Sequence, residues 1–276
     1  MFDAPRSYPS DLPPIASVMQ RSAGVCRVVL GPEGVRQLAQ SGSAKAMLPR
    51  TAGIPEVVFL NTSGGLTAGD SLSLSLCLGA GVAAVATTQT AERAYRAGDG
   101  PAAQVQVSLS VAAGGWLDWL PQEMILFNGA RLHRDTDISL GPDAGCLTVE
   151  TLVLGRAAMG ERVTQLDLRD SRTIRQGGRP VAAERLHLHD AALARQGAAM
   201  LAGARAIATL IRIGPGDWLA PVRAALTEPG VTGAASAVGN RLVVRLAAPD
   251  LWPLQQQLRR LLCVLRPGPL PRVWQM

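Results

Sequence analysis

The sequence predicts a mainly β protein whose strands stack in layers, with about two α-helices and the longer helix near the C-terminus. The main observation is a period of two: leucine occupies every even position from 72 to 78, and apolar residues alternate with polar residues from 104 to 111. Because successive side chains of a strand point to opposite faces, both segments are predicted to be half-buried strands. In the first two hundred residues we find no helical segments of about 10 to 15 residues, which disfavours a doubly wound α/β enzyme.

Further strands are expected where apolar and β-branched runs are bounded by turn residues. These runs cover residues 57–60, 82–87, 147–154, 162–168, 207–213 and 241–246. Glycine, proline, asparagine and aspartate separate them. The spacing fits stacked antiparallel layers, a barrel or a solenoid-like sheet, and periodicity does not choose among these architectures.

Helical periodicity is confined to the C-terminal part of the chain. From 250 to 266, leucines recur at steps of three and four residues, with Asp250 in position to cap the helix and Pro253 in its first turn. A shorter helix is expected at 218–226, capped by Asp217, because its apolar residues share one face.

The length of 276 residues is compatible with one β-rich domain. The first fourteen residues are rich in proline and polar groups, so residues 1–21 are expected to form a flexible tail. Residues 22–276 are expected to form a single domain.

The chain is basic, with 27 Lys and Arg against 21 Asp and Glu, a net charge of +6. The arginines are scattered along the whole chain without interleaved aromatic residues, so the sequence indicates no nucleic-acid interface. The charge also suits an acidic protein partner, through electrostatic steering that weakens as salt rises.

The N-terminus lacks the apolar core of a secretory signal, and we find no uncharged apolar span long enough to cross a membrane. The expected location is therefore the cytoplasm. The four cysteines, Cys26, Cys77, Cys146 and Cys263, lie far apart without a C-x-x-C pair, which predicts buried free thiols.

A glycine-rich segment at 61–71 has the G-x-x-x-x-G spacing of a phosphate loop at Gly64 and Gly69. The next residue is Asp70, however, where a phosphate loop has lysine. A carboxylate repels phosphate, and a strand is expected to follow in place of a helix. A tight glycine turn is therefore the favoured interpretation.

The chain has three histidines and no apparent catalytic triad. His187 and His189 would share one face of a strand, where they are either exposed polar positions or a weak metal site. His133 lies in a polar stretch that is interpreted as a solvated loop.

Four carboxylates occur in notable surroundings: Asp70 after the glycine turn, Glu123 and Glu150 among apolar residues, and Glu161 after Gly160. A buried carboxylate must be paired or bound to a metal. Ion pairs with the abundant arginines are one explanation. A passage for a divalent cation is the other, because carboxylate oxygens bind and release such ions.

Five short blocks of the chain carry distinctive residues. They are N-T-S-G-G-x-x-x-G-D at 61–70, T-T-Q-x-A-x-x-x-Y-R at 87–96, W-L-P-Q-E-x-I-L-F at 119–127, G-R-x-A-x-G-E at 155–161 and P-R-V-W at 271–274. In this order they resemble the UreD family, also called UreH, of urease accessory proteins. The motif positions are Asn61, Gly64, Gly65, Gly69, Thr87, Thr88, Gln89, Tyr95, Pro121, Gln122, Phe127, Gly155, Arg156 and Gly160.

The resemblance implies a non-catalytic chaperone that binds the urease apoprotein together with UreF and the GTPase UreG, as a possible dimer within the accessory complex. It implies a helical stack of strands with two helices, no tightly bound cofactor and an internal route for a transient nickel ion. By position in the matching blocks, Asp70, Glu123 and Glu161 are the candidates to line that route or the partner surfaces. The alternative hypothesis is a metal-dependent enzyme of unknown substrate on the same β scaffold.

Overall fold

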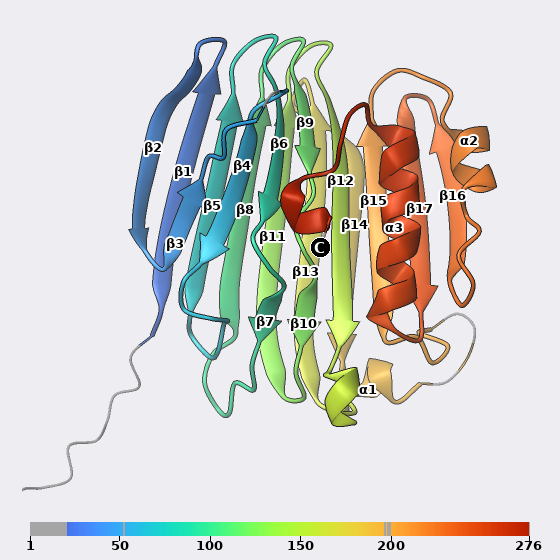
Figure 1. Cartoon of the computed structure of the whole chain (residues 1–276). Coiled ribbons are helices and arrows are strands. Elements are labelled where there is room, and N and C mark those ends of the chain that lie inside the picture. The colour runs from blue at the N-terminus through green and yellow to red at the C-terminus, as the bar shows by residue number, and fades with distance from the viewer. Residues whose placement is uncertain (1–20, 52, 196, 198–199, 276) are drawn as a thin grey trace, which may run out of the picture.

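The computed structural model describes residues 21–51, 53–195, 197 and 200–275, which fold mainly as two β-sheets lying face to face (Figure 1). Apart from Arg21, the expected tail lies outside the described residues. The first sheet has the spatial order β14-β13-β11-β8-β5-β1-β2. Its strands are β1 (Ala23–Gly31), β2 (Gly34–Gly42), β5 (Ser71–Leu78), β8 (Ala103–Val111), β11 (Ala130–Leu140), β13 (Leu166–Gln176) and β14 (Arg179–His189).

The second sheet runs in the order β16-β17-β15-β12-β9-β6-β4-β3, with β10 and β7 attached beside β12. Its strands are β3 (Ala44–Met47), β4 (Glu56–Asn61), β6 (Ala83–Thr88), β7 (Glu92–Ala94), β9 (Trp116–Trp119), β10 (Met124–Leu126), β12 (Gly145–Leu154), β15 (Ala206–Ile213), β16 (Thr232–Val238) and β17 (Arg241–Ala248). The helices are α1 (Asp190–Leu193), α2 (Leu219–Ala224) and α3 (Leu251–Leu265), with 3-10 turns at η1 (Ala157–Met159) and η2 (Arg272–Trp274).

From β4 to β13 the chain alternates between the two sheets, so each turn of chain stacks on the one before it. Neighbouring strands of one sheet therefore run in the same direction: β5 pairs parallel with β1 and β8, and β11 pairs parallel with β8 and β13. The layered, solenoid-like arrangement agrees with the sequence prediction. The antiparallel pairing expected for it is wrong in these central strands and holds at the ends, in pairs such as β13 with β14 and β15 with β17.

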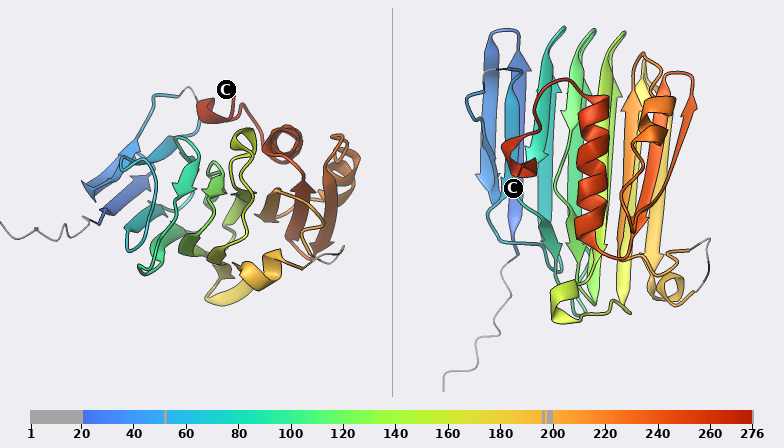
Figure 2. Two further views of the ribbon diagram at one scale, coloured as in Figure 1. Left: turned by 90° about the horizontal axis from the view of Figure 1, so that it is seen from below. Right: turned by 45° about the vertical axis from the view of Figure 1, so that its right-hand side comes forward.

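The period-two pattern has the expected structural basis. In β5 and β8 the apolar side chains point between the sheets and are buried, whereas their polar neighbours point outward. Each fully buried leucine stabilises the fold by roughly 1.5–3 kcal/mol. The second sheet is covered on its other face by α3, which is why every residue of β12 is buried (Figure 2).

The long C-terminal helix forms as predicted, and the side chain of Asp250 accepts a hydrogen bond from the Trp252 amide at 3.4 Å. The shorter helix α2 is less extensive than expected and is not capped by Asp217. Its N-cap is Trp218, whose indole folds back to donate to the Pro215 carbonyl at 3.1 Å. A third, single-turn helix, α1, was not expected.

Two further sequence predictions are wrong. His133 lies within β11 and not in a loop, because the alternation of charged residues with Leu132 and Ile138 is itself a strand pattern. Residues 162–165 precede β13 and do not begin it, because their backbone is held by Asn128, which accepts hydrogen bonds from the amides of Thr164 and Gln165.

All four cysteines are free thiols, and Cys26 and Cys146 are buried as predicted, whereas Cys77 is half-buried and Cys263 is exposed. Within the described ranges, no helix is both long and apolar enough to cross a membrane.

Candidate functional site

Four of the five sequence blocks lie side by side at one end of the stacked strands. β7 pairs in parallel with β10, and β10 pairs with the end of β12. The glycine turn joins this set through an isolated bridge between Leu66 and Ala94. The fifth block reaches the third, because the Trp274 indole donates to the Leu120 carbonyl at 2.9 Å. Segments far apart in the sequence thus form one continuous edge.

Motif side chains of four successive turns of chain are stacked along this edge. The Tyr95 hydroxyl donates to the Gly64 carbonyl at 3.0 Å, and the Tyr95 ring meets the edge of the Phe127 ring with centroids 4.9 Å apart. The Arg156 guanidinium lies over the Phe127 ring, 4.5 Å from its centroid. Gly65 has φ +146°, and a Cβ there would lie 2.4 Å from the Tyr95 ring. Glycine is therefore required for the tyrosine to pack.

The T-T-Q block ties the second turn of chain to the first and third. The buried Thr87 hydroxyl donates to the Leu120 carbonyl at 2.6 Å, and the Thr88 hydroxyl accepts from the Gln122 amide at 2.9 Å. The Gln89 amide donates to the Phe59 carbonyl at 2.9 Å. These bonds hold the loop that follows β6 in a defined position.

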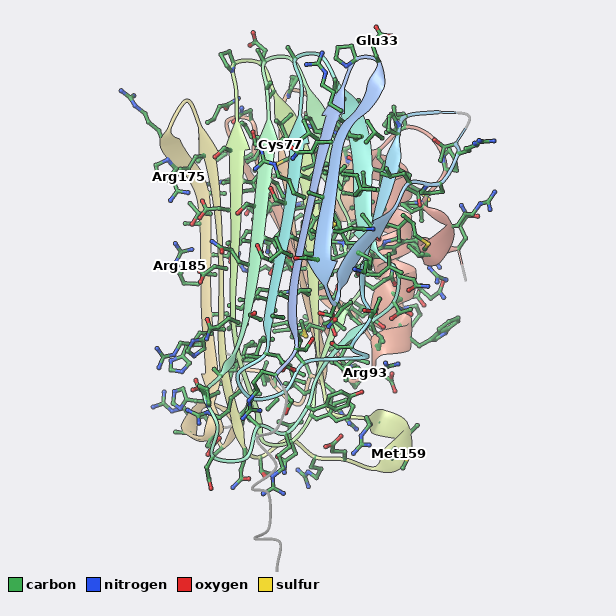
Figure 3. The ribbon with its side chains drawn as sticks, turned by 90° about the vertical axis from the view of Figure 1, so that its left-hand side faces the viewer. Glu33, Cys77, Arg93, Met159, Arg175 and Arg185 are labelled. Carbon is green, nitrogen blue, oxygen red and sulfur yellow. The ribbon has the colours of Figure 1, made fainter. Side chains whose placement is uncertain are left out.

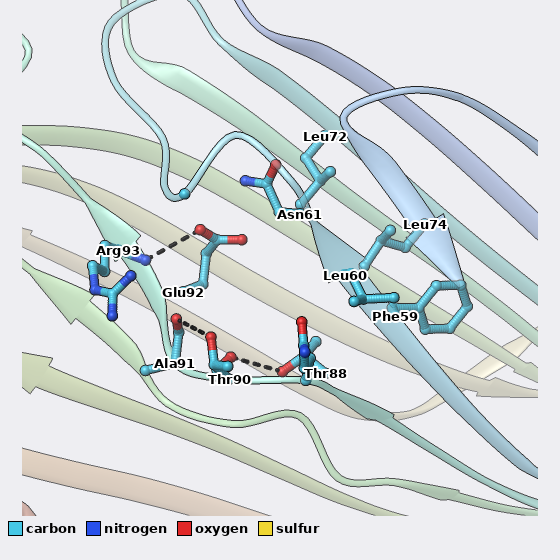
Figure 4. A pocket seen from close by; sticks show the side chains of 12 residues that line it. Phe59, Leu60, Asn61, Leu72, Leu74, Thr88, Thr90, Ala91, Glu92 and Arg93 are labelled. Carbon is cyan, nitrogen blue, oxygen red and sulfur yellow. Dashed lines mark hydrogen bonds between the residues drawn. The ribbon is translucent and has the colours of Figure 1, made fainter. Parts of the chain in front are cut away.

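A small hollow lies behind this loop, beside the glycine turn (Figure 4). Phe59, Leu72 and Leu74, which also belong to the core between the sheets, form its apolar floor. Asn61 and Glu92 face one another across it. The hollow therefore lies between the motif edge and the packed core.

Glu92 is the carboxylate that lines the hollow, and sequence reasoning did not select it. Burial raises the pKa of its carboxyl group, and the neighbouring Asn61 side chain and the hydrogen bond from the Arg93 backbone amide oppose this increase without cancelling it. The signal for Glu92 was its position inside the T-T-Q block. Only the structure shows that its carboxyl group turns into the hollow.

The outer surface of the same end carries both charges, with exposed Asp99 and Asp190 lying near Arg96. The side chains of Arg93, Arg96, Arg156 and Arg162 are exposed there. Met159 is 72% exposed in η1, and it projects from the same end of the molecule as Arg93 (Figure 3). An exposed methionine among arginines is suited to contact with an acidic protein surface that offers an apolar recess.

Asp70 is buried, but it does not line the hollow. Its two carboxylate oxygens accept hydrogen bonds from the amides of Ser22 and Thr67, at 2.7 and 2.8 Å. The side chain therefore closes the glycine turn and attaches it to the start of β1.

Glu161 and Glu123 also have structural partners. Glu161 accepts from the Asn128 amide and from the Arg156 amide and guanidinium. Burial raises the pKa of Glu161, but these bonds outweigh burial and hold it below its ordinary value. Glu123 accepts from the Gln255 amide group at 3.2 Å, which links the third block to α3. The structure thus places the three candidates at separate points around the edge.

Glu150 is part of a buried ionic network between the sheets. Arg134 contacts it at 2.7 Å and binds Asp170 through two parallel hydrogen bonds of 2.8 and 2.9 Å. The Trp119 indole donates to the other Glu150 oxygen at 3.2 Å. Ion pairing with arginine, one of the two explanations expected from sequence, is therefore confirmed for Glu150. Across the part of the chain that is described, no group of three or more His, Cys, Asp and Glu side chains is arranged to hold a metal ion.

Comparison with known proteins finds close relatives over nearly the whole length. Residues 23–275 match the sequence profile of the family described as UreD urease accessory protein. A protein of Paracoccus denitrificans (strain Pd 1222) named urease accessory protein UreD is 59% identical over 262 residues, covering 94% of each chain. The protein of that name from Cereibacter sphaeroides (strain ATCC 17029) is 60% identical over 273 residues, covering 96% of this chain and 99% of its own. The one from Dinoroseobacter shibae is 46% identical over 285 residues, covering all of both chains.

Proposed function

The chain belongs to the UreD family of urease accessory proteins, and from this premise we propose that it is a non-catalytic chaperone of urease maturation. In this proposal it binds the urease apoprotein together with UreF and UreG and helps to deliver nickel to the urease active site. Turnover, including any GTP hydrolysis, is assigned to its partners. Nickel is cargo that passes through the complex and not a resident cofactor of this chain.

One observation carries the proposal beyond the family assignment: the sequence blocks meet at a single edge that holds a hollow floored by core side chains. A scaffold that passes an ion between partners needs a polar opening next to its docking surface. The Glu92 carboxylate supplies oxygen ligands at that opening, and hard oxygen ligands allow a divalent ion to exchange. The Asn61 side-chain oxygen beside it accepts from the Ser63 amide and hydroxyl. We place the mouth of the nickel route here.

Asp70, Glu123 and Glu161 keep a role in the proposal, although a different one from the lining expected at first. Each accepts hydrogen bonds that position a loop or helix around the edge. They would act on nickel delivery by keeping the opening and the docking surface in shape. Their replacement by the amides is expected to reduce urease activation without abolishing nickel contact at Glu92.

The experiment is urease activity, with nickel supplied, in cells that carry urease and every other accessory gene. Deletion of this gene should abolish the activity and its restoration should recover it. Glu92→Gln should then lower activation at limiting nickel, and excess nickel should restore part of the loss. Glu33→Gln, the same change in the exposed turn between β1 and β2, is the matched control. Full activity in the deletion strain would overturn the proposal and direct attention to the metal-dependent enzyme, tested by screening the purified chain for turnover.

A further inference from the structure

Two imidazoles stand side by side on the outer face of the first sheet, at the end farthest from β2. His187 and His189 alternate along β14, so both point away from the core, and their ring centroids are 4.8 Å apart. Both residues are exposed, and half of the His187 side chain is open to solvent. Two histidines two residues apart on one strand face can present a nitrogen each to one ion without any backbone change.

A carboxylate of the neighbouring strand orients one of these rings. Asp167 of β13 lies opposite His189, and its Oδ1 is 3.4 Å from the Nε2 of His187. A carboxylate beside one ring nitrogen favours the tautomer with the proton on that nitrogen, which leaves the lone pair of the other nitrogen, Nδ1, available to a metal. This arrangement of carboxylate, imidazole and open nitrogen is the usual support of a metal-binding histidine.

The surrounding charges favour weak and reversible binding. Arg169, opposite His187, lies with its Nε 3.8 Å from the same Asp167 oxygen, so part of its charge is offset. Arg185 belongs to the same hairpin (Figure 3), but its guanidinium is held toward the Arg172 carbonyl and the Thr173 hydroxyl. Arg131, the register partner of Asp167 on β11, donates to the Gly100 carbonyl. The cations therefore reduce the affinity for a divalent ion but leave the two ring nitrogens accessible.

We propose that His187 and His189 form a two-imidazole site for a divalent ion of the nickel, zinc or copper class, with Asp167 as its positioning residue. Imidazole is a preferred ligand of these ions. Water completes the coordination, so the site is open and the ion exchanges. The site does not rest on the proposed function: β13, β11 and β8 lie between β14 and the strand β5 that borders the hollow.

The test is a titration of the full chain, without a polyhistidine tag, with nickel chloride by isothermal calorimetry. Zinc chloride is titrated in parallel. The wild-type chain should bind one equivalent more than His187→Ala combined with His189→Ala. His133→Ala, which removes the only other histidine, is the matched control and should keep that equivalent. Asp167→Asn should weaken the site by about tenfold, the usual effect of removing a group that orients a metal ligand.

A spectroscopic readout separates ligation from a change in fold. Cobalt bound to the wild-type chain should give an absorption band of imidazole coordination that the double variant lacks. The circular dichroism spectra of the two proteins should match, because both side chains are exposed. Equal stoichiometry and affinity in the wild type and the double variant would overturn the site. Urease activation is measured separately, so loss of the site leaves the proposed function untouched.

Discussion

The interior of this protein changes character along the stack of strands. In β1, β5 and β8 the inward positions are apolar, as in the aligned row Cys26, Leu74 and Val107. The same row continues into β11 and β13 as Thr136 and Arg172, both buried. One architecture therefore holds an apolar interior at its N-terminal half and a buried charged network among apolar residues at its C-terminal half.

This difference indicates how a fold built from repeated turns of chain fixes the register of its strands. Apolar contacts are non-directional and tolerate neighbouring registers, whereas a buried ion pair is stable in one arrangement only. The bidentate contact of Arg134 with Asp170 and its contact with Glu150 join β11 to both β13 and β12. Burying these charges has a desolvation cost, so the network contributes specificity more than net stability.

The largest expected effect comes from breaking the charged half. Arg134→Met leaves the carboxylates of Glu150 and Asp170 buried without their partner, which should destabilise the fold by about 3–5 kcal/mol. The measurement is chemical denaturation followed by circular dichroism. Combining Arg134→Met with Glu150→Leu and Asp170→Leu should recover part of the loss, because no unpaired carboxylate stays buried while the neighbouring buried Arg172 loses its countercharges. If Arg134→Met alone were as stable as the wild type, the three residues of the network would not be energetically coupled.

A cavity in the apolar half should cost slightly less. Leu76 is fully buried between its register partners Val28 and Leu109. Leu76→Ala should destabilise by about 2–4 kcal/mol through lost burial and the cavity that remains. Leu76→Met, which conserves volume, is the control and should cost less than about 1.5 kcal/mol. Equal losses in the two variants would contradict an apolar half that depends on close packing.

The contributions of the two halves to stability should also differ at acidic pH. Burial raises the pKa of Asp170, but Arg134 outweighs burial and lowers it. Stability from a carboxyl group of lowered pKa is present above its unfolded pKa, near 4, and is lost as pH falls through the folded value. The wild type should therefore lose about 1.5–3 kcal/mol in this window, the contribution of a charge-assisted hydrogen bond, relative to the triple apolar variant. If the two proteins lost the same stability as pH falls, this contribution would be disproved.

The smallest effect is expected at Glu92, above the apolar floor of the hollow. Because burial raises its pKa, the charged form is disfavoured in the folded state, and stability falls as pH rises through the window between the unfolded and folded values. Glu92→Gln should thus be slightly more stable than the wild type at pH 7 and equally stable below pH of about 4. Thermal unfolding at both pH values measures this. A less stable variant at pH 7 would show that the carboxylate has a structural role.

Much of the fold follows from local pattern. The leucines at 72, 74, 76 and 78 and the leucine period of α3 predict their elements because one face of each is buried. Strand direction cannot be predicted in this way, since alternation is the same in parallel and antiparallel sheets. Asp217 resembles a helix cap, but the N-cap is Trp218 and the helix begins at Leu219. The indole of Trp218 donates to the Pro215 carbonyl.

The candidate site was predictable at the level of blocks and not of single contacts. The block containing Thr87 and Tyr95 marks the edge correctly. Sequence does not show that Asp70 accepts hydrogen bonds from two backbone amides or that the Glu92 side chain points into the hollow. Both depend on neighbouring turns of chain. The partners of Arg134 were equally hidden, since 36 residues separate it from Asp170.

The alternation of the chain between sheets also constrains synthesis on the ribosome. Each turn of chain uses the previous one as its template, so the stack can grow from its N-terminal end as the polypeptide emerges. The last turn, ending in β12, stays open at its edge until β15 pairs with it. A nascent chain that stalls before Ala206 would expose that edge to other chains, and exposed strand edges promote aggregation. Yield should therefore depend on uninterrupted translation between β12 and β15.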